Sequence, residues 1–351
     1  MNKTGKNFKG RGTGFNPLNR FEKIGFEFDE EEISNLEKPK TEFYRDSPKT
    51  ILTYNESPDT GFEVGINPYR GCEHGCIYCY ARPTHEFLGL SAGLDFETQI
   101  FVKENAPILL RKELSQKKWK PQTVAISGNT DCYQPAEKHF ELTRKCLEVL
   151  LEFKNPVGII TKNNLITRDI DILKEFASLN AALAVISVTT LDQKLAGLME
   201  PRTSRPYLRL KAIEELTEAG IPVMVLVAPV IPGLTDHEIP EIIKNTVNAG
   251  AVGAAYVMLR LPYAVSDLFT KWIETHYPNK KNKILNRIKS VRKGKLNSAE
   301  FGKRMTGEGI FARQVKDMFE LSCKKNGINN SRIELSTNHF RNPDDKQQRL
   351  F

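Results

Sequence analysis

The stretch FEVGINPYRGCEHGCIYCYAR, residues 62–82, places three cysteines shortly after an apolar run. Cys72, Cys76 and Cys79 have the spacing Cys-x3-Cys-x2-Cys, so their thiolates can converge on one metal centre from a single loop. Glycines before the first and second cysteine free the backbone to curl around such a centre. Because the chain has only six cysteines, this cluster indicates metal or redox chemistry and not a disulfide scaffold.

Two kinds of metal centre fit three clustered cysteines. A structural zinc site normally has four ligands, so zinc would need His74 or His85 as the fourth. An iron–sulfur cubane held by three cysteines leaves one iron open for a substrate or cofactor. The absence of a fourth nearby cysteine favours a [4Fe–4S] cluster held by Cys72, Cys76 and Cys79, with zinc as the alternative.

Six short apolar runs, alternating with helical patterns, set the fold class. The runs are FEVGINP (62–68), TVAISGN (123–129), VGIITKN (157–163), LAVISVTT (183–190), VMVLVAPV (223–230) and AAYVMLRLP (254–262). The helical patterns cover 139–153, 168–179, 207–220 and 238–250, the last two ending in glycine. This alternation predicts an α/β fold with a parallel sheet built from βαβ units. Periodicity alone leaves an open sheet and a closed or partly closed barrel as alternatives.

The two ends of the chain differ from this core. Residues 1–60 are rich in polar and charged side chains and are expected to form a partly disordered leader. Residues 61–276 are expected to form the core domain, and residues 277–351 a basic, helical C-terminal extension. Within the extension, residues 309–328 have the pattern of an amphipathic helix.

Composition limits the class of protein. The balance of 40% hydrophobic and 27% charged residues is that of a soluble globular protein, and no apolar run is long enough to cross a membrane. No apolar stretch follows the basic N-terminus, so a cytoplasmic protein without a membrane partner is expected. The net charge of +8 lies mainly in residues 3–20 and 280–295, which form either a solvated basic surface or a contact for an anionic partner such as nucleic acid.

The motif in 62–82, with the aromatic Tyr78 just before the last cysteine, resembles that of the radical SAM superfamily. The resemblance covers roughly residues 60–276 and implies a partial (βα)6 TIM-like barrel, which matches the six runs. It further implies that S-adenosylmethionine binds the open iron and is cleaved by one electron to methionine and a 5′-deoxyadenosyl radical, which abstracts hydrogen from a substrate. The substrate is not readable from the sequence, and a reducing partner such as flavodoxin or ferredoxin would supply the electron.

By the same resemblance, the segment SGNTD (127–131) lies where the family binds the methionine amino group. Ser127, Asn129, Thr130 and Asp131 carry acceptors suited to an ammonium group. The family usually has a glutamate at this place, so the sequence departs from the pattern. An ordinary strand-to-loop turn is the alternative.

Two further strand ends and one aromatic residue complete the expected S-adenosylmethionine site. Lys162 can pair with the methionine carboxylate as a point charge, and Ser187 suits the carboxylate or the ribose. Tyr78 and the apolar residues 257–262 can enclose the adenine. The alternatives are a lysine snorkelling at a strand end, a serine bonded within its strand, and ordinary core residues.

The segment EPRTS (200–204) and the leader segment RGTGFNPLNRFEK (11–23) point to the spore photoproduct lyase branch of the superfamily. Thr203 or Ser204 could cap the helix that follows. Glu200 and Arg202 could form an ion pair with each other or contact the cofactor or substrate.

The resemblance to that branch raises nucleic-acid repair or modification as an alternative function. The lyases carry a hydrogen-donating cysteine after the second strand, where this chain has Gly128. Cys132 is the remaining weak candidate for a catalytic residue, and a buried inert thiol is the alternative. A third alternative is a non-catalytic iron–sulfur sensor or scaffold.

Overall fold

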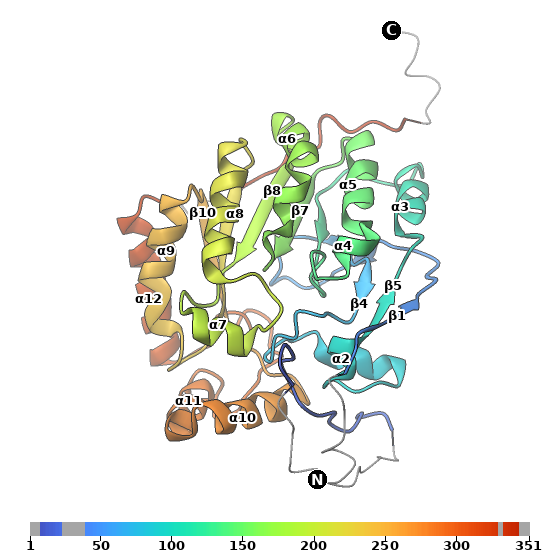
Figure 1. Cartoon of the computed structure of the whole chain (residues 1–351). Coiled ribbons are helices and arrows are strands. Elements are labelled where there is room, and N and C mark those ends of the chain that lie inside the picture. Colours follow the sequence, from blue (N-terminus) through green and yellow to red (C-terminus); the bar gives the residue numbers. More distant parts are fainter. Residues whose placement is uncertain (1–7, 23–38, 329–332, 344–351) are drawn as a thin grey trace.

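The structure, a computed structural model, describes residues 8–22, 39–328 and 333–343. Its main feature is a seven-stranded sheet with the order β10-β9-β8-β7-β6-β3-β2 (Figure 1). The strands are β2 (Thr53–Tyr54), β3 (Val64–Ile66), β6 (Val124–Ile126), β7 (Val157–Thr161), β8 (Ala182–Ser187), β9 (Val223–Val230) and β10 (Gly253–Met258). All pair in parallel except β2, which runs antiparallel to β3.

Each of the six apolar runs contains one of the parallel strands, so the predicted α/β fold is confirmed. The sheet follows chain order from β3 to β10, as right-handed βαβ units produce. In the described part of the chain β10 and β2 are edge strands that do not pair with each other. The sheet is therefore open between these two edges.

Helices cover the outer face of this sheet, while α10 (Val265–His276) and α11 (Lys281–Ser290) lie below it (Figure 1). The other long helices are α3 (Ala106–Leu114), α5 (Leu142–Glu152), α6 (Ile170–Ser178), α8 (Pro206–Glu218), α9 (Ile239–Asn248) and α12 (Ile310–Lys325). The shorter ones are η1 (Arg82–Leu88), α2 (Asp95–Thr98), α4 (Glu137–Phe140), η2 (Asn164–Asp169), α7 (Gln193–Met199), η3 (Asp236–Glu238) and η4 (Pro278–Lys280). The four helical patterns of the core correspond to α5, α6, α8 and α9, and the expected C-terminal helix is α12. Gly220 and Gly250 follow α8 and α9 with φ of +82° and +102°, as helix-ending glycines do.

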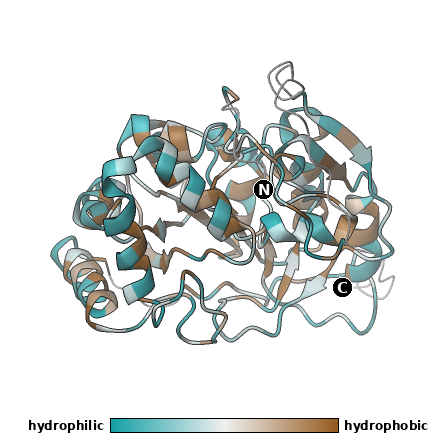
Figure 2. Ribbon diagram, turned by 90° about the horizontal axis from the view of Figure 1, so that it is seen from below, coloured by the Kyte–Doolittle hydropathy of each residue, from teal (hydrophilic) through white to brown (hydrophobic). Residues whose placement is uncertain are grey.

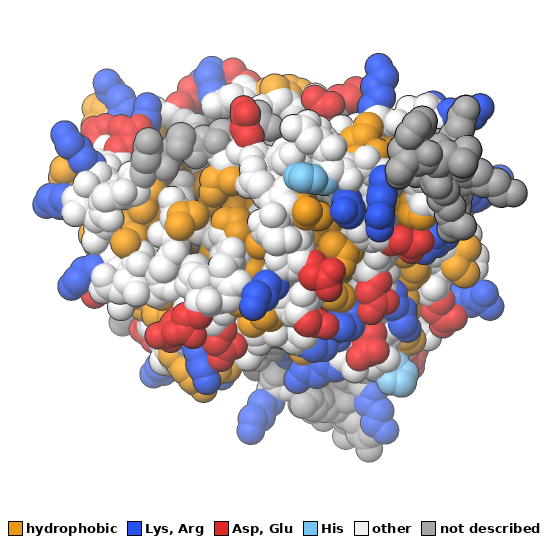
Figure 3. Space-filling model, turned by 90° about the horizontal axis from the view of Figure 1, so that it is seen from above, with side chains coloured by type: hydrophobic (Ala, Val, Ile, Leu, Met, Phe, Trp, Pro, Cys, Tyr) orange, Lys and Arg blue, Asp and Glu red, His pale blue; other side chains and the backbone are white. Residues whose placement is uncertain are grey.

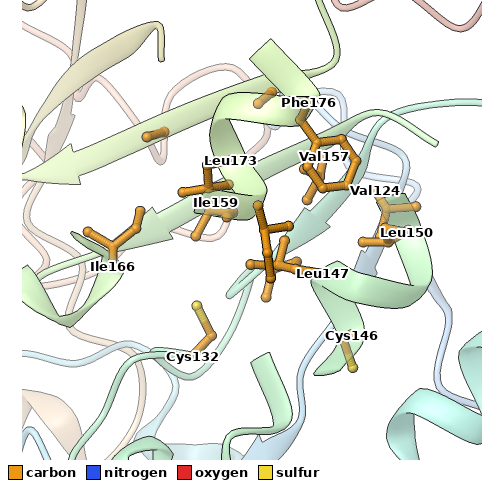
Figure 4. Close-up of a cluster of buried hydrophobic side chains, with 14 of the residues drawn as sticks. Val124, Cys132, Cys146, Leu147, Leu150, Val157, Ile159, Ile166, Leu173 and Phe176 are labelled. Carbon is orange, nitrogen blue, oxygen red and sulfur yellow. The ribbon is translucent and has the colours of Figure 1, made fainter. Parts of the chain in front are cut away.

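The core lies between the sheet and these helices. Val124, Val157 and Ile159 from the strands meet Leu147 and Phe176 from α5 and α6, and all are fully buried (Figure 4). Burying each side chain of this size stabilises the fold by roughly 1.5–3 kcal/mol. Hydrophobic and hydrophilic residues alternate along the outer helices, as one-sided burial requires (Figure 2).

A second sheet of three strands was not predicted. It has the order β1-β5-β4, with β1 (Glu42–Arg45), β5 (Gln99–Val102) and β4 (Tyr69–Arg70). Its strands are short, and β1 is exposed along its length, so no apolar periodicity marks it. It matters for function because β4 ends two residues before Cys72.

The leader predicted over residues 1–60 is only partly described. Residues 1–7 and 23–38 lie outside the described residues. The described segment 8–22 is packed on the core and buries Arg11 and Thr13. Residues 8–22 therefore lie against Glu97, which follows the cysteine loop in the chain.

The C-terminal extension is joined to the edge of the main sheet. The Met258 amide donates to the Met305 carbonyl at 2.7 Å, and the buried Arg292 donates to the carbonyls of Met258 and Leu259. The loop before α12 therefore folds over the end of β10. Among the described residues no helix has both the length and the apolar character needed to span a bilayer. The face seen from above carries acidic and basic side chains interspersed (Figure 3).

Candidate active site

A cavity of about 530 Å³ opens at the C-terminal ends of the parallel strands. Polar side chains that follow the strands, and the thiols of Cys72, Cys76 and Cys79, line it together. All six residues expected to bind S-adenosylmethionine also line it: Tyr78, Ser127, Thr130, Asp131, Lys162 and Ser187. The structure thus gathers residues more than a hundred positions apart around one space.

The cysteine loop needs its two glycines. Gly71 and Gly75 have φ of +79° and +66°, where side chains other than hydrogen are strained. A Cβ at Gly71 would lie 2.9 Å from the His85 ring, and one at Gly75 would lie 2.6 Å from the Glu97 carboxylate. The backbone is therefore wound tightly around the thiols.

Burial dominates the electrostatics of the three thiols. It raises the pKa of Cys72 and Cys76 well above the ordinary value and raises that of Cys79 as well. Without a metal the three groups hold their protons, and a bound metal centre must displace them.

A buried ion pair braces the loop from behind. Arg82 Nη2 lies 2.6 Å from Glu97 Oε1, and both side chains are fully buried. Arg82 also donates from Nε to the Cys76 carbonyl at 2.9 Å and from Nη2 to the Gly75 carbonyl at 3.2 Å. The pair therefore fixes the backbone at the second cysteine and at the glycine that precedes it.

The leader segment closes over the same pair. The amides of Gly12 and Thr13 donate to the Glu97 carboxylate at 2.8 and 3.2 Å. A Cβ at Gly12 would overlap the Gly75 carbonyl oxygen, so only glycine permits this approach. The sequence analysis did not predict this contact between the leader and Glu97. The only sequence feature that marks it is the glycine-containing segment RGTG in the leader.

The two histidines near the cysteines have other partners. His74 Nδ1 lies 3.4 Å from Asp131 Oδ2, and its Nε2 lies 3.2 Å from the Asn163 amide nitrogen. His85 Nε2 lies 2.9 Å from the Gln99 carbonyl. Among the described residues, no three His, Cys, Asp or Glu side chains form a site for a single metal ion. His74 and His85, the two residues that zinc would need as a fourth ligand, are thus each bonded to a protein group.

The carboxylate oxygens of Asp131 are already bonded to other groups of the protein. Its carboxylate accepts from Thr161 Oγ1 at 2.7 Å, from the Lys162 amide at 2.8 Å and from the Tyr133 amide at 2.9 Å. Burial would raise its pKa, but His74 and these donors lower it to about 2. Asp131 therefore carries a fixed negative charge that ties two strand ends together.

The rest of the 127–131 loop is also held in place. Ser127 has φ of +80°, and its hydroxyl donates to the Thr130 carbonyl at 2.7 Å. Thr130 Oγ1 donates to the Tyr69 carbonyl at 2.8 Å. The loop is thus a rigid wall of the cavity, with its backbone turned sharply after β6.

Lys162 and Ser187 keep much of their polar capacity for a ligand. Lys162 Nζ donates to the Ala228 carbonyl at 3.2 Å, and burial lowers its pKa. The Ser187 hydroxyl is nearly buried at the cavity wall and has no hydrogen-bond partner among the described residues. The ammonium group and the hydroxyl could both bind a carboxylate.

Tyr78 is anchored by a buried network that the sequence did not reveal. Its hydroxyl donates to Glu200, which also accepts from Thr189 Oγ1 at 2.6 Å and pairs with Arg209. The expected pair of Glu200 with Arg202 is wrong. The structure brings Glu200 to Arg209, one turn into α8, whose side chain reaches back to it.

Arg202 has another partner as well, and the expected cap of the following helix is absent. Arg202 pairs with Glu73, at 3.0 Å, across the cysteine loop. Neither Thr203 nor Ser204 caps α8, whose N-cap is Arg205 without a side-chain bond and whose first residue is Pro206.

Cys132 is not among the residues that line the cavity. Its side chain is fully buried among apolar residues of the core (Figure 4). Burial raises the pKa of this thiol well above its ordinary value. The arrangement is that of a packed thiol and not of a group that meets a substrate.

Comparison with known proteins adds the family. The model of the radical SAM superfamily matches residues 66–245, about half of the chain, so the chain belongs to this superfamily. An uncharacterised protein of Mycobacterium tuberculosis is 36% identical over 219 residues, 62% of this chain and 64% of the relative. One of Methanocaldococcus jannaschii is 30% identical over 233 residues, 66% of this chain and 83% of the relative. The match thus spans less than two thirds of the mycobacterial relative.

Solved structures show the same fold. A point mutant of spore photoproduct lyase aligns with TM-score 0.58 at 18% identity, over 81% of this chain and 79% of the lyase. Another structure of that lyase, with bound AdoMet and dinucleoside spore photoproduct, aligns with TM-score 0.57 at 16% identity over the same shares. At these identities the likeness establishes the fold. The core is a radical SAM enzyme domain, a family that implies S-adenosylmethionine and an iron–sulfur cluster as cofactors.

Proposed function

We propose that this protein binds a [4Fe–4S] cluster through Cys72, Cys76 and Cys79 and cleaves S-adenosylmethionine reductively. One electron from the reduced cluster would yield methionine and a 5′-deoxyadenosyl radical, which abstracts hydrogen from the substrate. The observation that carries the proposal is the shared cavity. Two buried thiols and the half-buried thiol of Cys79, with no fourth cysteine beside them in the part of the chain that the structure describes, open into the same space as a lysine and a serine placed for a carboxylate.

The chain's own residues would hold and orient the cofactor. Lys162 would pair with the methionine carboxylate and Ser187 would donate to the carboxylate or ribose. The acceptors of the 127–131 loop would bind the ammonium group, most simply through backbone carbonyls and Asn129, because Asp131 is already saturated. The apolar end of β10, with Val257 and Leu259, would cover the adenine and exclude water.

This proposal is tested by anaerobic reconstitution with iron and sulfide. The reduced protein should give the paramagnetic signal of a [4Fe–4S] cluster, and S-adenosylmethionine should change that signal by binding the open iron. Bound zinc without iron, or a cluster signal insensitive to S-adenosylmethionine, would favour the zinc or sensor alternatives.

Replacing Lys162 with methionine should weaken S-adenosylmethionine binding about tenfold or more, because a charge-assisted hydrogen bond to the carboxylate is lost. Equilibrium binding to the reconstituted protein measures the change. Lys174→Met, on the exposed face of α6, removes the same charge away from the cavity and should bind normally. Equal affinities of the two variants would remove Lys162 from the site.

Replacing Cys132 with alanine should leave S-adenosylmethionine cleavage within about twofold of the unaltered protein, because the thiol lies outside the cavity. Loss of the buried sulfur should lower the free energy of unfolding by about 1 kcal/mol. Product assays and denaturant titration measure the two effects. A loss of turnover at normal stability would restore Cys132 as a catalytic candidate.

The electron donor would dock beside the cysteine loop. A surface pocket there is lined by the basic side chains Lys9, Arg11, Lys40 and Arg202. It also includes Glu73, the neighbour of Cys72. Such a surface suits an acidic one-electron donor such as flavodoxin or ferredoxin. Reduction by flavodoxin should slow as salt is raised, and a rate independent of salt would contradict this docking.

The basic segment 280–295 gives the nucleic-acid alternative no added support. Lys281 pairs with Glu274, and Arg287 lies 3.5 Å from Asp236. Lys293 lies within 3.6 Å of acidic side chains of the same extension. Part of the basic excess is therefore neutralised within the fold.

A further inference from the structure

Two arginines line the cavity beside the cysteine loop and have no part in holding S-adenosylmethionine as proposed above. Arg260 follows the end of β10, and Arg304 comes from the loop before α12. The Arg260 guanidinium lies 5.3 Å from the ring centroid of Tyr80, the residue after Cys79. The arginines therefore belong to the same space as the thiols.

Arg260 lacks an oxygen acceptor among the described residues. Its Nη1 contacts the Met305 thioether at 3.8 Å, a weak acceptor, and its Nε is buried without a hydrogen-bond partner. Burial and the neighbouring Arg304 both lower its pKa. A partly buried guanidinium without an acceptor is costly unless a ligand supplies one.

Arg304 is held in place by Asp59, and both carboxylate oxygens of Asp59 already have partners. Arg304 Nε lies 2.6 Å from Asp59 Oδ2, and Nη2 donates to Ser57. The other oxygen of Asp59 accepts from the Gly302 amide at 2.7 Å. The carboxylate thus holds Arg304 directly, whereas Arg260 has no carboxylate within hydrogen-bonding distance among the described residues and feels Asp59 only through space.

The acidic side chain that lines the cavity is not bonded to Arg260 either. Asp131 is the only Asp or Glu among the residues that line the cavity, and its oxygens are taken by the donors described above. Ser57, which is bonded to Arg304, lines the cavity too and offers a polar atom there. The surroundings are therefore arranged for an anion.

We propose that Arg260, assisted by Arg304, binds an oxyanion of the substrate, a phosphate or a carboxylate. The planar guanidinium matches the two oxygens of either group and can donate two parallel hydrogen bonds. The inference rests on the proposed function, since it assigns to the substrate the part of the cavity that bound S-adenosylmethionine would not occupy. It defines the substrate as an anionic molecule anchored at the wall formed by β10 and the C-terminal extension.

The test measures anion binding without turnover. Inorganic phosphate or acetate is titrated into the reconstituted protein saturated with S-adenosylmethionine, with chloride keeping the ionic strength constant. The melting temperature should rise with at least one of the two anions, and the stronger one identifies the group. Binding should be about tenfold weaker or more in Arg260→Gln and unchanged in Arg313→Gln, an exposed arginine of α12.

Arg260→Lys provides a second variant that keeps the charge but loses the planar fork. It should bind the anion with intermediate affinity, and it serves as the test if Arg260→Gln does not fold. In chloride alone Arg260→Gln should melt no lower than Arg313→Gln, because a partly buried charge without a directly bonded carboxylate has been removed.

Three results would overturn the proposal. One is the absence of an anion-specific rise in melting temperature, and another is equal binding by Arg260→Gln and Arg313→Gln. The third is loss of the anion effect once S-adenosylmethionine is added, which would assign the arginines to that cofactor's carboxylate. Each readout is independent of S-adenosylmethionine cleavage, so a failure of the proposed function is seen separately.

Discussion

Replacing Cys76 with alanine is expected to abolish both iron–sulfur cluster binding and S-adenosylmethionine cleavage. Two thiolates cannot hold a cubane whose three protein ligands come from one loop. Iron and sulfide analysis after anaerobic reconstitution measures the first effect, and 5′-deoxyadenosine formation measures the second. Cleavage should fall to the level found without protein.

The matched control is Cys146→Ala. Cys146 is a fully buried thiol of α5 that does not line the cavity, so its loss should leave iron content and cleavage near normal. If Cys76→Ala kept its iron and its activity, the cluster would be held elsewhere. Equal losses in the two variants would indicate damage to folding and not loss of a ligand.

Glu97→Gln should produce the largest effect on stability. The change removes the charge that pairs with buried Arg82 and that accepts the amides of Gly12 and Thr13. Breaking a buried ion pair by removing one partner costs roughly 3–5 kcal/mol, because the other charge stays buried. Denaturant unfolding of the reconstituted protein measures the loss.

The leader should be released in the same variant. Proteolysis should cut within residues 8–22 faster than in the unaltered protein. The cluster should also be lost more quickly, because Arg82 would no longer be held where it bonds to the backbone at Gly75 and Cys76. Glu175→Gln, on the exposed side of α6, is the control. A loss in Glu97→Gln no larger than in this control would contradict the bracing role.

The main sheet and its helices could be predicted because their signals are local. Each apolar run contains one parallel strand, and β-branched residues such as Val157 and Ile159 mark it without any distant contact. The candidate site followed from the topology, since parallel strands place Lys162 and Ser187 at the same edge. The cysteine loop could be found because its three ligands are neighbours in the chain.

The parts that could not be predicted depend on contacts between distant segments. Gly12 lies against Gly75, and Arg304 pairs with Asp59, but no periodic pattern in the sequence predicts either contact. The partner of Glu200 was misassigned because Arg202 is nearer in sequence than Arg209. Which arginine reaches Glu200 depends on where α8 begins, and the sequence spacing around Glu200 does not specify that position.

The most direct test of the central claim is reductive cleavage of S-adenosylmethionine. The reconstituted protein is reduced with dithionite under anaerobic conditions and S-adenosylmethionine is added. The account predicts 5′-deoxyadenosine and methionine in equal amounts, formed only when protein, reductant and S-adenosylmethionine are all present. An intact, reduced cluster that yields no 5′-deoxyadenosine would contradict it.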